Sequence, residues 1–510
     1  IATFLLLLGC INFINLTSAR ASQRAKEIGI RKTIGSSKKQ LVLQFLSETF
    51  FITAVATIVS VMLTPLLLNM FADYIPPGLH FDLLHQPYLI LFLLLLTILV
   101  SFLSGLYPAL ILSGYKPALV LKNQIFINSG QTRSAGIRKI LTVSQFVIAQ
   151  FFIIATLMIS KQINYSLNKD LGFRKEAILT FETPFDTSAN HGRQLLNEIK
   201  SIPEVEMTSR GFFSPADAGA AFTNIVYHNG KEEIRPNVQI RWGDTNYLKV
   251  YQIKLLAGRN IEQSDTIKEF IINETYAKAM GLQSPEEALG KQLNFNGKNM
   301  PVVGVMNDFH DQSLRAAISP LVFAGNSGST FHIRLKPNSL GSTVWKNAIS
   351  KIQKAYKQIY PENDFSYSFL DEEIAGFYKT EQRTASLLKW ATGLAILISC
   401  LGLLGLVIYT TNTRTKEIGI RKILGASVAG IVSILSKDFM RLVLIAFVIA
   451  APIAWWVIYK WLEDFAYRTT ISWWVFGLSG IAMIIIALLT LSIQTVRSAI
   501  ANPVKSLRTE

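Results

Sequence analysis

A segment of fourteen residues occurs twice in this chain, and this repeat limits the fold more than any other feature. The two copies, residues 24–37 and 414–427, lie 390 positions apart and share ten identical residues. Each copy follows one strongly apolar stretch and precedes two more. The sequence therefore predicts that a whole module, centred on a basic segment, is present twice.

The apolar residues are clustered in stretches of the length that a membrane span needs. A helix of roughly 20 residues crosses the hydrocarbon core of a bilayer. The apolar stretches lie at about 1–16, 41–72, 88–113, 140–160, 388–410, 430–462 and 473–496. The first is short, residue 1 is not Met, and no charged segment precedes it. We therefore interpret the chain as beginning inside a membrane helix rather than with a signal peptide.

The positive charge lies on one side of these predicted helices. A formal net charge of +16 would on its own suit a nucleic-acid-binding protein. The basic residues gather instead in four segments, at 20–39, 116–139, 414–422 and 497–508. The short loops on the other side, 73–87 and 463–472, contain a single basic residue, Arg468. The positive-inside rule makes the basic side cytoplasmic and places residues about 162–386 outside, so we expect no nucleic-acid partner.

The outer region is predicted to be a mixed α and β domain. Apolar and β-branched runs predict strands at 177–181, 238–242, 270–272 and 302–305. Helical patterns fall near 191–201, 273–280 and 343–359. A region of about 225 residues is long enough to bury its own core.

Two helices are expected to extend beyond the membrane as a stalk. Residues 371–389 contain no Pro and lead directly into the apolar stretch that starts at Trp390. We expect one continuous helix that projects about 25–30 Å from the bilayer. The fourth helix is expected to continue through residues 161–165. Two such extensions can transmit motion.

The repeated segment has the pattern of a short, basic, amphipathic helix. Glu27 precedes Arg31 by four residues, the favourable orientation for a helical ion pair, and Ile30 and Ile34 share one face. The equivalent residues of the second copy are Glu417, Arg421, Ile420 and Leu424. Such a helix can lie on the membrane or bind in the groove of a partner protein. The duplication favours a two-fold partner, because lipid does not require the same residues twice.

With these segments the chain resembles a known family, the MacB/FtsX-type permeases of ABC transporters. The repeated segments look like the cytoplasmic coupling segments of that family. Residues 256–259, 289–291 and 302–309, and residues 271–274 with Ala277 and Lys278, resemble parts of its MacB-like periplasmic core domain. The resemblance implies that the coupling segments contact an ABC-type ATPase subunit. The docking residues implied in this way are Lys26, Glu27, Ile28, Gly29, Ile30, Arg31, Lys32 and Gly35, with Lys416, Glu417, Ile418, Gly419, Ile420, Arg421, Lys422 and Gly425.

The predicted fold is a membrane α-helical protein with an α+β extracytoplasmic domain. It has two FtsX-like three-helix modules plus a stalk helix. The expected domains are a first permease module (1–122), a cytoplasmic linker (123–139), a transmembrane and stalk helix (140–161), a MacB-like periplasmic core domain (162–370), and a stalk helix with the second permease module (371–510). Family members with this layout have a helix and a first outer domain upstream, so the resemblance implies eight spanning helices and an N-terminal truncation. The implied location is the bacterial inner membrane, with residues about 162–386 in the periplasm.

The resemblance implies a permease subunit that transmits ATPase-driven movement to a periplasmic domain, for export or efflux of a substrate handled on the periplasmic side. The sequence has no phosphate-binding loop, because the segments at Gly290 and Gly297 fail in spacing and at the Ser/Thr position. We therefore expect no enzyme activity and no cofactor in this chain, with ATP bound by the partner subunit. Membrane lipid is a second expected partner. A periplasmic adaptor and a second copy of the chain stay open.

Two other functions stay open. A regulatory or signalling protein of FtsX type would use the same movement to control an outer hydrolase or to sense a toxic ligand. A membrane-bound enzyme would need its own chemistry, and the sequence contains no G-x-S-x-G nucleophile motif. Enzyme chemistry is therefore the weakest of the three interpretations.

Two acidic residues, Glu48 and Asp438, are again 390 positions apart and lie about two turns inside the second helix of each module. An acid at membrane depth indicates a functional role by default. Near the cytoplasmic end, however, it can pair with a Lys or Arg of the loop at little cost. We interpret both acids as structural anchors, with a role in coupling as the alternative.

Other polar residues have simpler explanations. Within the apolar stretches, interhelical hydrogen bonds account for Asn12, Asn15, Gln145 and Gln150. The two cysteines, Cys10 and Cys400, suit small residues packed between helices. Asp308, His310 and Asp311 lie within four residues but lack a distant fourth ligand, so we predict a solvated turn and no metal site.

Overall fold

The chain divides into two compact units. One comprises Ile1–Ser160, Arg383–Trp461 and Thr470–Glu510, and the other Lys161–Gln382 and Leu462–Thr469. The computed structural model describes all residues except 76–77, 79–80, 84, 115–129, 185–188, 218–220, 231, 265, 338–341, 414–419, 422, 425–426 and 501–510. The second unit therefore includes the short loop Leu462–Thr469, which lies in the chain between two helices of the first.

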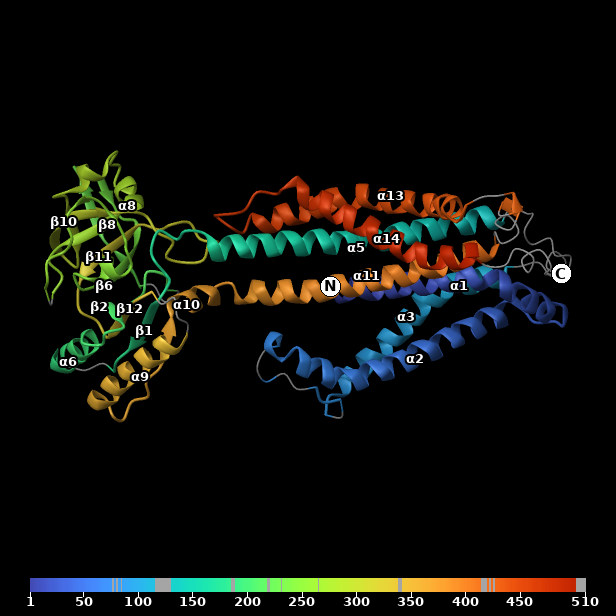
Figure 1. Ribbon diagram of the computed structural model, residues 1–510, viewed down its shortest axis with the longest axis horizontal. Coiled ribbons are helices and arrows are strands. Elements are labelled where there is room, and N and C mark those ends of the chain that lie inside the picture. Colours follow the sequence, from blue (N-terminus) through green and yellow to red (C-terminus); the bar gives the residue numbers. More distant parts are fainter. Residues whose placement is uncertain are drawn as a thin grey trace. The chain divides into compact units, whose positions relative to one another are not determined.

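Long apolar helices dominate the first unit (Figure 1). They are α1 (Ala2–Thr33), α2 (Lys38–Met70), α3 (Pro87–Ser113), α5 (Gly130–Asn168), α11 (Lys379–Thr413), α13 (Val428–Leu462) and α14 (Trp473–Ile500), with the short 3-10 helix η1 (Ala72–Tyr74) after α2. Within the described residues, six helices are long and apolar enough to cross a membrane, and Ala2–Ser18 is a shorter apolar segment. The apolar stretches predicted from the sequence are confirmed as helices.

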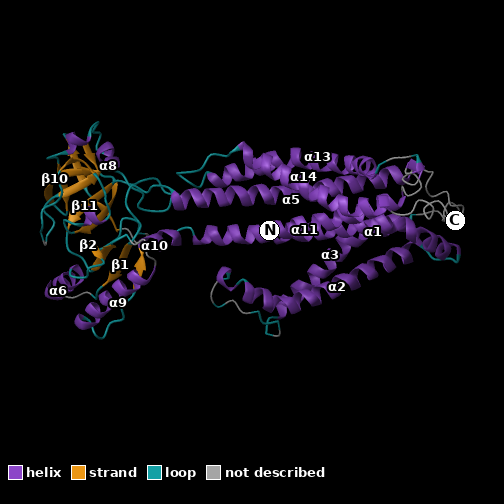
Figure 2. Ribbon diagram, in the orientation of Figure 1, coloured by secondary structure: helices purple, strands orange, loops and turns teal. Residues whose placement is uncertain are grey.

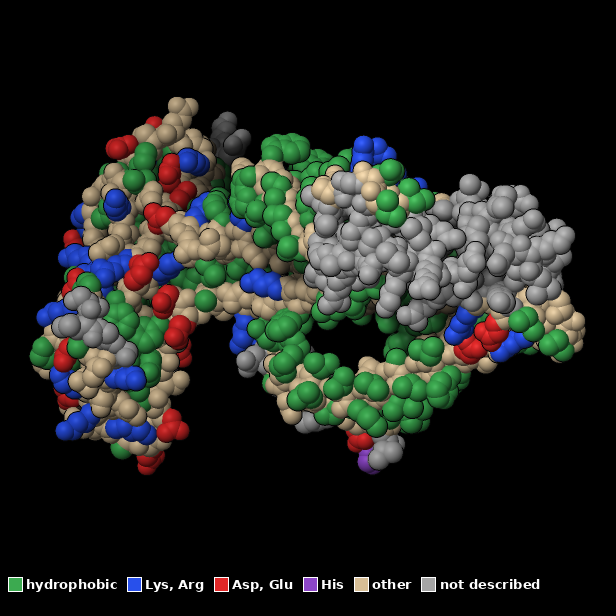
Figure 3. Space-filling model, turned by 45° about the vertical axis from the view of Figure 1, so that its right-hand side comes forward, with side chains coloured by type: hydrophobic (Ala, Val, Ile, Leu, Met, Phe, Trp, Pro, Cys, Tyr) green, Lys and Arg blue, Asp and Glu red, His purple; other side chains and the backbone are tan. Residues whose placement is uncertain are grey.

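The first unit has a large shared apolar core and a large apolar surface. Helices α1, α5, α11, α13 and α14 contribute to the core, which includes Leu8, Phe146 and Val443. Helices α2 and α3 instead expose many large apolar side chains, such as Phe51 and Leu95. In Figure 3 hydrophobic side chains cover much of these two helices, and a group of Lys, Arg, Asp and Glu side chains lies at one of their ends. A contiguous apolar surface of this extent suits contact with lipid.

Strands and shorter helices form the second unit (Figure 2). Among the described residues the sheet order is β13 (Tyr367–Phe369), β1 (Ile178–Glu182), β12 (Thr330–Leu335), β2 (Val205–Gly211), β6 (Asn237–Gly243), β11 (Leu321–Gly325), β8 (Phe270–Asn273), β10 (Lys298–Met306), β9 (Gln292–Phe295), β4 (Val226–Asn229) and β5 (Glu232–Ile234). In addition, β3 (Ala221–Asn224) pairs with β6, and β7 (Leu255–Gly258) pairs with β10. The pairs β6–β11 and β8–β10 are parallel. The strands predicted from the sequence correspond to β1, β6, β8 and β10.

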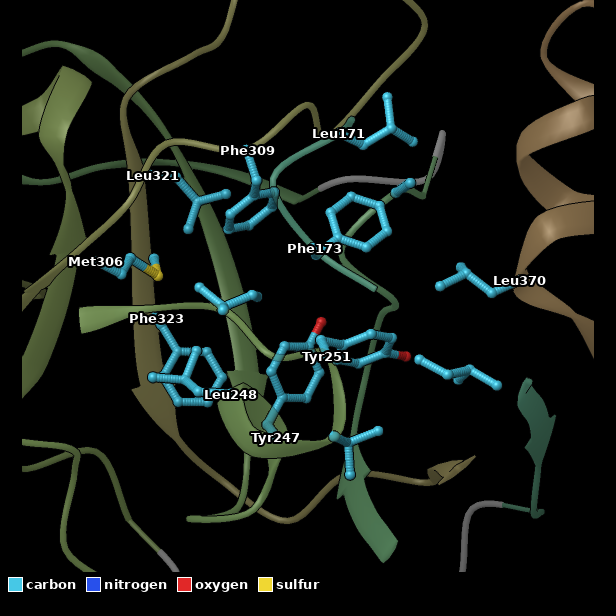
Figure 4. Close-up of a cluster of buried hydrophobic side chains, with 14 of the residues drawn as sticks. Leu171, Phe173, Tyr247, Leu248, Tyr251, Met306, Phe309, Leu321, Phe323 and Leu370 are labelled. Carbon is cyan, nitrogen blue, oxygen red and sulfur yellow. The ribbon is translucent and has the colours of Figure 1, made fainter. Parts of the chain in front are cut away.

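Helices cover the sheet and close separate apolar clusters. Helices α6 (Ala189–Lys200) and α9 (Ser342–Ile359) contribute Leu195 and Ile352 to a cluster with strands β1, β2 and β12. Helix α8 (Glu274–Ala279) and η3 (Pro285–Ala288) border a second cluster. Helices α7 (Tyr247–Val250) and α10 (Leu370–Gly376) enclose a third, in which Tyr247, Tyr251 and Phe323 lie together (Figure 4). The three predicted helices correspond to α6, α8 and α9.

Helix boundaries at the stalk differ from the expectation. Residues 371–389 do not form one helix, because α10 ends at Gly376 and α11 begins at Lys379. Between them Tyr378 is buried, and its hydroxyl accepts a hydrogen bond from the Leu314 amide at 2.8 Å. The chain turns here to bury this ring, a long-range contact that local helix propensity does not reveal.

Helix α5 is longer than predicted. It begins at Gly130, so the last part of the predicted linker 123–139 is helical, and it continues to Asn168. The expected continuation through residues 161–165 is therefore confirmed. Residues 115–129 lie outside the described part of the chain.

Candidate functional site

We expected the first copy of the repeat to form a short separate helix, and this expectation is wrong. The copy forms the last turns of α1 and the turn into α2. The helix ends in a Schellman motif, in which the Gly35 amide donates to the Lys32 carbonyl at 3.1 Å and the Ser36 amide to the Arg31 carbonyl at 3.0 Å. Gly35 has a φ of +106°, a conformation that residues with a side chain rarely adopt. The glycine at this position therefore terminates the helix.

Helix α2 begins immediately after this turn with a capping box. The Ser37 hydroxyl accepts a hydrogen bond from the Gln40 amide at 3.3 Å, and the Gln40 side chain accepts one from the Ser37 amide at 2.8 Å. The Ser-x-x-Gln pattern is a recognised signal of a helix start, although the prediction of a separate helix overlooked it. The turn between α1 and α2 is consequently short and hydrogen-bonded at both ends.

A small apolar core lies beneath the turn. Ile28 of α1 is 2% exposed and packs with Leu41 and Phe45 of α2 and with Ala109 and Leu112 of α3. The cation of Lys32 donates to the carbonyl of Ser113, the last residue of α3, at 2.6 Å. A positive charge at a helix C-terminus is favourable because the helix dipole is negative there. Both following helices therefore support the end of α1.

A chain of polar contacts also joins α1 to α2. The predicted pair Glu27–Arg31 is present at 2.6 Å. Arg31 donates to the side-chain Oε1 atom of Gln44 at 2.9 Å, and the side-chain Nε2 atom of Gln44 donates to the Glu48 carboxylate at 3.4 Å. Glu48 also pairs with Arg24 at 3.0 Å. Gln44 was not among the predicted site residues, although its spacing of four from Glu48 places both on one helix face.

The carboxylate of Glu48 therefore has the partner that a structural anchor needs. Both side chains of the Arg24–Glu48 pair are about half exposed, at 50% and 42%. The repeat equivalent, Asp438, is an exposed residue of α13. The geometry is compatible with anchoring and leaves the alternative role in coupling as a separate question.

The supported turn leaves apolar residues exposed at matching positions of the two copies. Ile30 and Ile34 are 43% and 81% exposed, and their equivalents Ile420 and Leu424 are 52% and 80% exposed. Arg421 is also described. The predicted residues outside the described part of the chain are Lys416, Glu417, Ile418, Gly419, Lys422 and Gly425, and the side chain of Lys26 is not described. We call the exposed side chains of Ile30 and Ile34 the apolar tip of the turn between α1 and α2. Such a tip, flanked in sequence by basic residues, can insert into a groove of another protein.

The solvated turn predicted at residues 308–311 is wrong. His310 and Asp311 are 7% and 3% exposed. Asp308 accepts hydrogen bonds from the amide and hydroxyl of Thr275, at 2.9 and 2.7 Å. Phe309 belongs to the cluster of Figure 4 and draws this polar segment into the fold. Within the described residues no group of three or more His, Cys, Asp or Glu side chains is placed to hold a metal ion.

Two of the four polar residues singled out in the membrane helices make the interhelical hydrogen bonds that we expected. Gln145 of α5 donates to the Ile398 carbonyl of α11 at 3.0 Å, and Gln150 donates to the Val443 carbonyl of α13 at 3.3 Å. For Asn12 and Asn15 of α1 the expectation is not confirmed, because their Oδ1 atoms are buried without a hydrogen-bond partner among the described residues. Hydrogen bonds of this kind hold helices together where water is absent.

Duplicated three-helix modules, an exposed basic turn and a separate α+β unit define a multi-pass membrane protein with an extracytoplasmic domain. The family model described as FtsX-like permease C-terminal matches residues 1–117 and 391–503. The model described as MacB-like periplasmic core domain matches residues 140–345. The chain belongs to the MacB/FtsX-type permeases of ABC transporters, and it is a multi-pass protein of the inner membrane with a periplasmic domain.

Curated relatives are similar over part of their length. The macrolide export ATP-binding/permease protein MacB of Aggregatibacter actinomycetemcomitans is 23% identical over 215 residues, which cover 40% of this chain and 32% of the relative. The uncharacterized ABC transporter permease YknZ of Bacillus subtilis is 23% identical over 248 residues, which cover 45% and 58%. The chain thus spans less than two thirds of the length of these relatives.

Solved structures of related periplasmic regions were also found. The periplasmic region of MacB from Actinobacillus actinomycetemcomitans is 15% identical, with a TM-score of 0.29, and the match covers 41% of this chain and 95% of that one. The extracellular domain of YknZ from Gram-positive bacteria is 16% identical, with a TM-score of 0.26, and the match covers 38% and 97%. Because these scores are low, the family membership rests on the family models and the curated relatives.

Proposed function

We propose that this chain is the permease subunit of an ABC transporter, in which movement driven by an ATPase reaches the periplasmic domain and moves a substrate handled there. The ATPase is a separate subunit that binds the ATP. The family membership supports this proposal, as do relatives whose names describe ABC permeases and one ATP-binding export protein.

The observation that carries the proposal is the exposed apolar tip on the turn between α1 and α2, a turn that hydrogen bonds and apolar packing hold in place. Ile30 and Ile34 would cost free energy if they remained in water, whereas a partner's groove would bury them. The Schellman motif, the capping box and the core around Ile28 fix the turn to α1 and α2. A force on the tip therefore displaces both helices rather than bending a loop.

The second copy of the repeat supports a partner with two equivalent sites. Ile420 and Leu424 are exposed to nearly the same extent as Ile30 and Ile34. Two ATPase subunits that close on each other would press on both tips together. The docking residues of the proposal are therefore those that the resemblance implied in the two copies.

Export is the proposed outcome because the MacB relative is named for macrolide export. The substrate class is identified by adding candidate compounds to the permease–ATPase complex and measuring which of them stimulates ATP hydrolysis. Stimulation by a peptide, lipoprotein or drug supports transport. Stimulation only by a cell-wall hydrolase contradicts export and supports a regulatory role.

The decisive experiment removes the repeated glutamates together. The chain is reconstituted in lipid with the ABC-type ATPase that co-purifies with it, and ATP hydrolysis is measured with wild type and with the double variant E27Q/E417Q. We expect the permease-dependent part of ATP hydrolysis to be lost. The structural cost of E27Q is small, because an exposed i,i+4 ion pair contributes only about 0.3–0.5 kcal/mol.

A matched control separates docking from a general effect of ion-pair loss. Glu274 and Lys278 of α8 form an i,i+4 pair at 2.6 Å, the same distance as Glu27–Arg31. The variant E274Q should keep the full permease-dependent hydrolysis. Retention of full coupled activity by E27Q/E417Q would show that the docking assignment is wrong.

A further inference from the structure

The loop Leu462–Thr469, which joins α13 to α14, belongs to the same compact unit as the periplasmic domain. Backbone hydrogen bonds attach it to the segment that follows β10. The Tyr467 amide donates to the Leu314 carbonyl at 3.0 Å, and the Ala466 amide donates to the Arg315 carbonyl at 3.2 Å. In Figure 1 the same loop lies beside the end of α5.

Gln162 of α5 attaches this loop from the other side. Its side chain is completely buried and uses both ends of the amide on the loop backbone. The Nε2 atom donates to the Tyr467 carbonyl at 3.3 Å, and the Oε1 atom accepts from the Thr469 amide at 2.8 Å. A buried amide that pairs with two backbone groups fixes the position of the loop relative to α5, because breaking either bond leaves a buried polar group unsatisfied.

Aromatic contacts complete the attachment. The Tyr467 ring packs edge-on against the His310 ring, with centroids 4.4 Å apart, and the Lys169 Nζ atom lies 4.6 Å from the centre of the same ring. Phe465 is buried, and the Cζ atom of the Arg315 guanidinium lies 4.6 Å from the centre of the Phe465 ring. These contacts hold the middle of the loop, at Phe465 and Tyr467.

The segment that receives the loop is also bonded to the other stalk helix. Arg315 forms an ion pair with Glu381 of α11 at 2.7 Å, and the Leu314 amide donates to Tyr378. Glu381 is only 13% exposed, so this pair is better shielded than most surface pairs. Residues 310–315 are therefore the point where the loop, α5 and the start of α11 meet.

We propose that the loop Leu462–Thr469 is a clamp that carries movement of α13 and α14 directly to residues 310–315 of the periplasmic domain, with Gln162 as its positioning residue. This inference rests on the proposed function and adds a second mechanical connection to the stalk helices. The outer loop of the first module, near Tyr74, belongs to the other unit and supplies a natural comparison.

The docking of the loop is tested by cross-linking in the full chain. In a background without native cysteines (C10S/C400S), the pair R315C/A466C should form a disulfide under mild oxidation. Backbone N and O atoms 3.2 Å apart place the two Cα atoms within the range that a disulfide spans. The single variants R315C and A466C in the same background are the controls and should form no intramolecular disulfide. If R315C/A466C formed no more intramolecular disulfide than the single variants, the proposal would be overturned.

The mechanical role is tested by hydrogen exchange of the reconstituted permease–ATPase complex, with and without ATP. In wild type, ATP should change the exchange of residues 308–316. This change should be largely lost in Q162L and in Y467A, which disrupt the clamp from its two sides. It should persist in N164L, which removes an exposed amide two residues along α5, and in Y74A.

The outcomes separate the clamp from the function on which it rests. An ATP response that persists unchanged in Q162L and Y467A overturns the clamp and leaves the proposed function standing. No ATP response anywhere in the wild-type chain contradicts the proposed function, and the transmission role of the clamp with it. Loss of the response in N164L and Y74A as well would show a general effect and would also overturn the specific role of the loop.

Discussion

Asn12 and Gly402 lie against each other, and each is the equivalent of the other in the 390-residue repeat. A Cβ atom at residue 402 would be 2.9 Å from the Asn12 Oδ1 atom. Contact between equivalent residues is expected where two copies of a module meet face to face. The two modules of the first unit therefore contact each other at equivalent positions of α1 and α11. Leu16 and Gly405, one position from equivalence, are also in contact there.

Replacing Gly402 with a large residue should disrupt this contact. We expect G402L to lower the stability of the helical unit by about 1–3 kcal/mol, because the added side chain must displace Asn12 and Gln145. Thermal unfolding of the purified protein in detergent measures the effect. The control is G393L in the same helix, since a Cβ at Gly393 meets no atom within 4 Å. An equal loss of stability in both variants would contradict the close contact.

Ile28 and Ile30 should separate support of the turn from docking. Ile28 is 2% exposed, so I28A should reduce stability by about 2–4 kcal/mol through the cavity it leaves. Ile30 is 43% exposed, so I30A should leave the unfolding temperature nearly unchanged and weaken binding of the ATPase. Unfolding and co-purification of the ATPase are measured on the same preparations. The docking assignment would fail if I30A bound the ATPase as wild type does.

Glu48 should behave as an anchor with a small energetic contribution. A double-mutant cycle of R24A and E48A should give a coupling energy below about 1 kcal/mol, because both side chains are about half exposed to solvent. The variant E48Q should retain permease-dependent ATP hydrolysis. If E48Q abolished that hydrolysis without loss of stability, the role in coupling would be correct instead.

The stability of the periplasmic unit should fall as the pH falls from 6.5 to 4. Burial, assisted by the nearby Lys169 cation, lowers the pKa of His310 from its ordinary value of 6.5 to about 4. In this pH range the unfolded chain binds a proton that the folded chain does not, so acidification favours unfolding. The contribution of His310 is at most about 3 kcal/mol, and it is fully present above pH 6.5.

The variant H310Q tests this assignment. It should unfold with a shallower dependence on pH between 6.5 and 4 than wild type, whatever its stability at neutral pH. His332, whose pKa burial lowers to about 3, remains in the variant and should keep part of the dependence. Identical pH profiles of wild type and H310Q would show that His310 is not the titrating group.

The sequence predicted the features that local pattern determines. Continuous apolar runs predicted the membrane helices, and β-branched runs predicted strands such as β8 and β10. The i,i+4 pair of Glu27 and Arg31 also follows from local spacing, and it is present. These features depend on residues that are neighbours in the chain.

The features that were missed depend on distant residues. Burial of Tyr378 against Leu314 breaks the stalk helix, and packing of Phe309 buries the polar residues beside it. No periodicity near either site reveals these contacts. Gln44 joins the site only because α2 folds back beside Arg31. The Gly35 turn that makes this possible was visible in the sequence as a glycine after a basic helix end, a common helix-stop signal.

Helix α11 has a consequence for the size of the movements. It runs unbroken over 35 residues and contains no proline. Gly402, where it meets α1, divides it into arms of about 35 Å towards Lys379 and about 16 Å towards Thr413. If this contact is the fulcrum, the helix is an unequal lever, and a shift at its cytoplasmic end is about doubled at the other end. Paired spin labels at the two ends would measure this mechanical advantage directly.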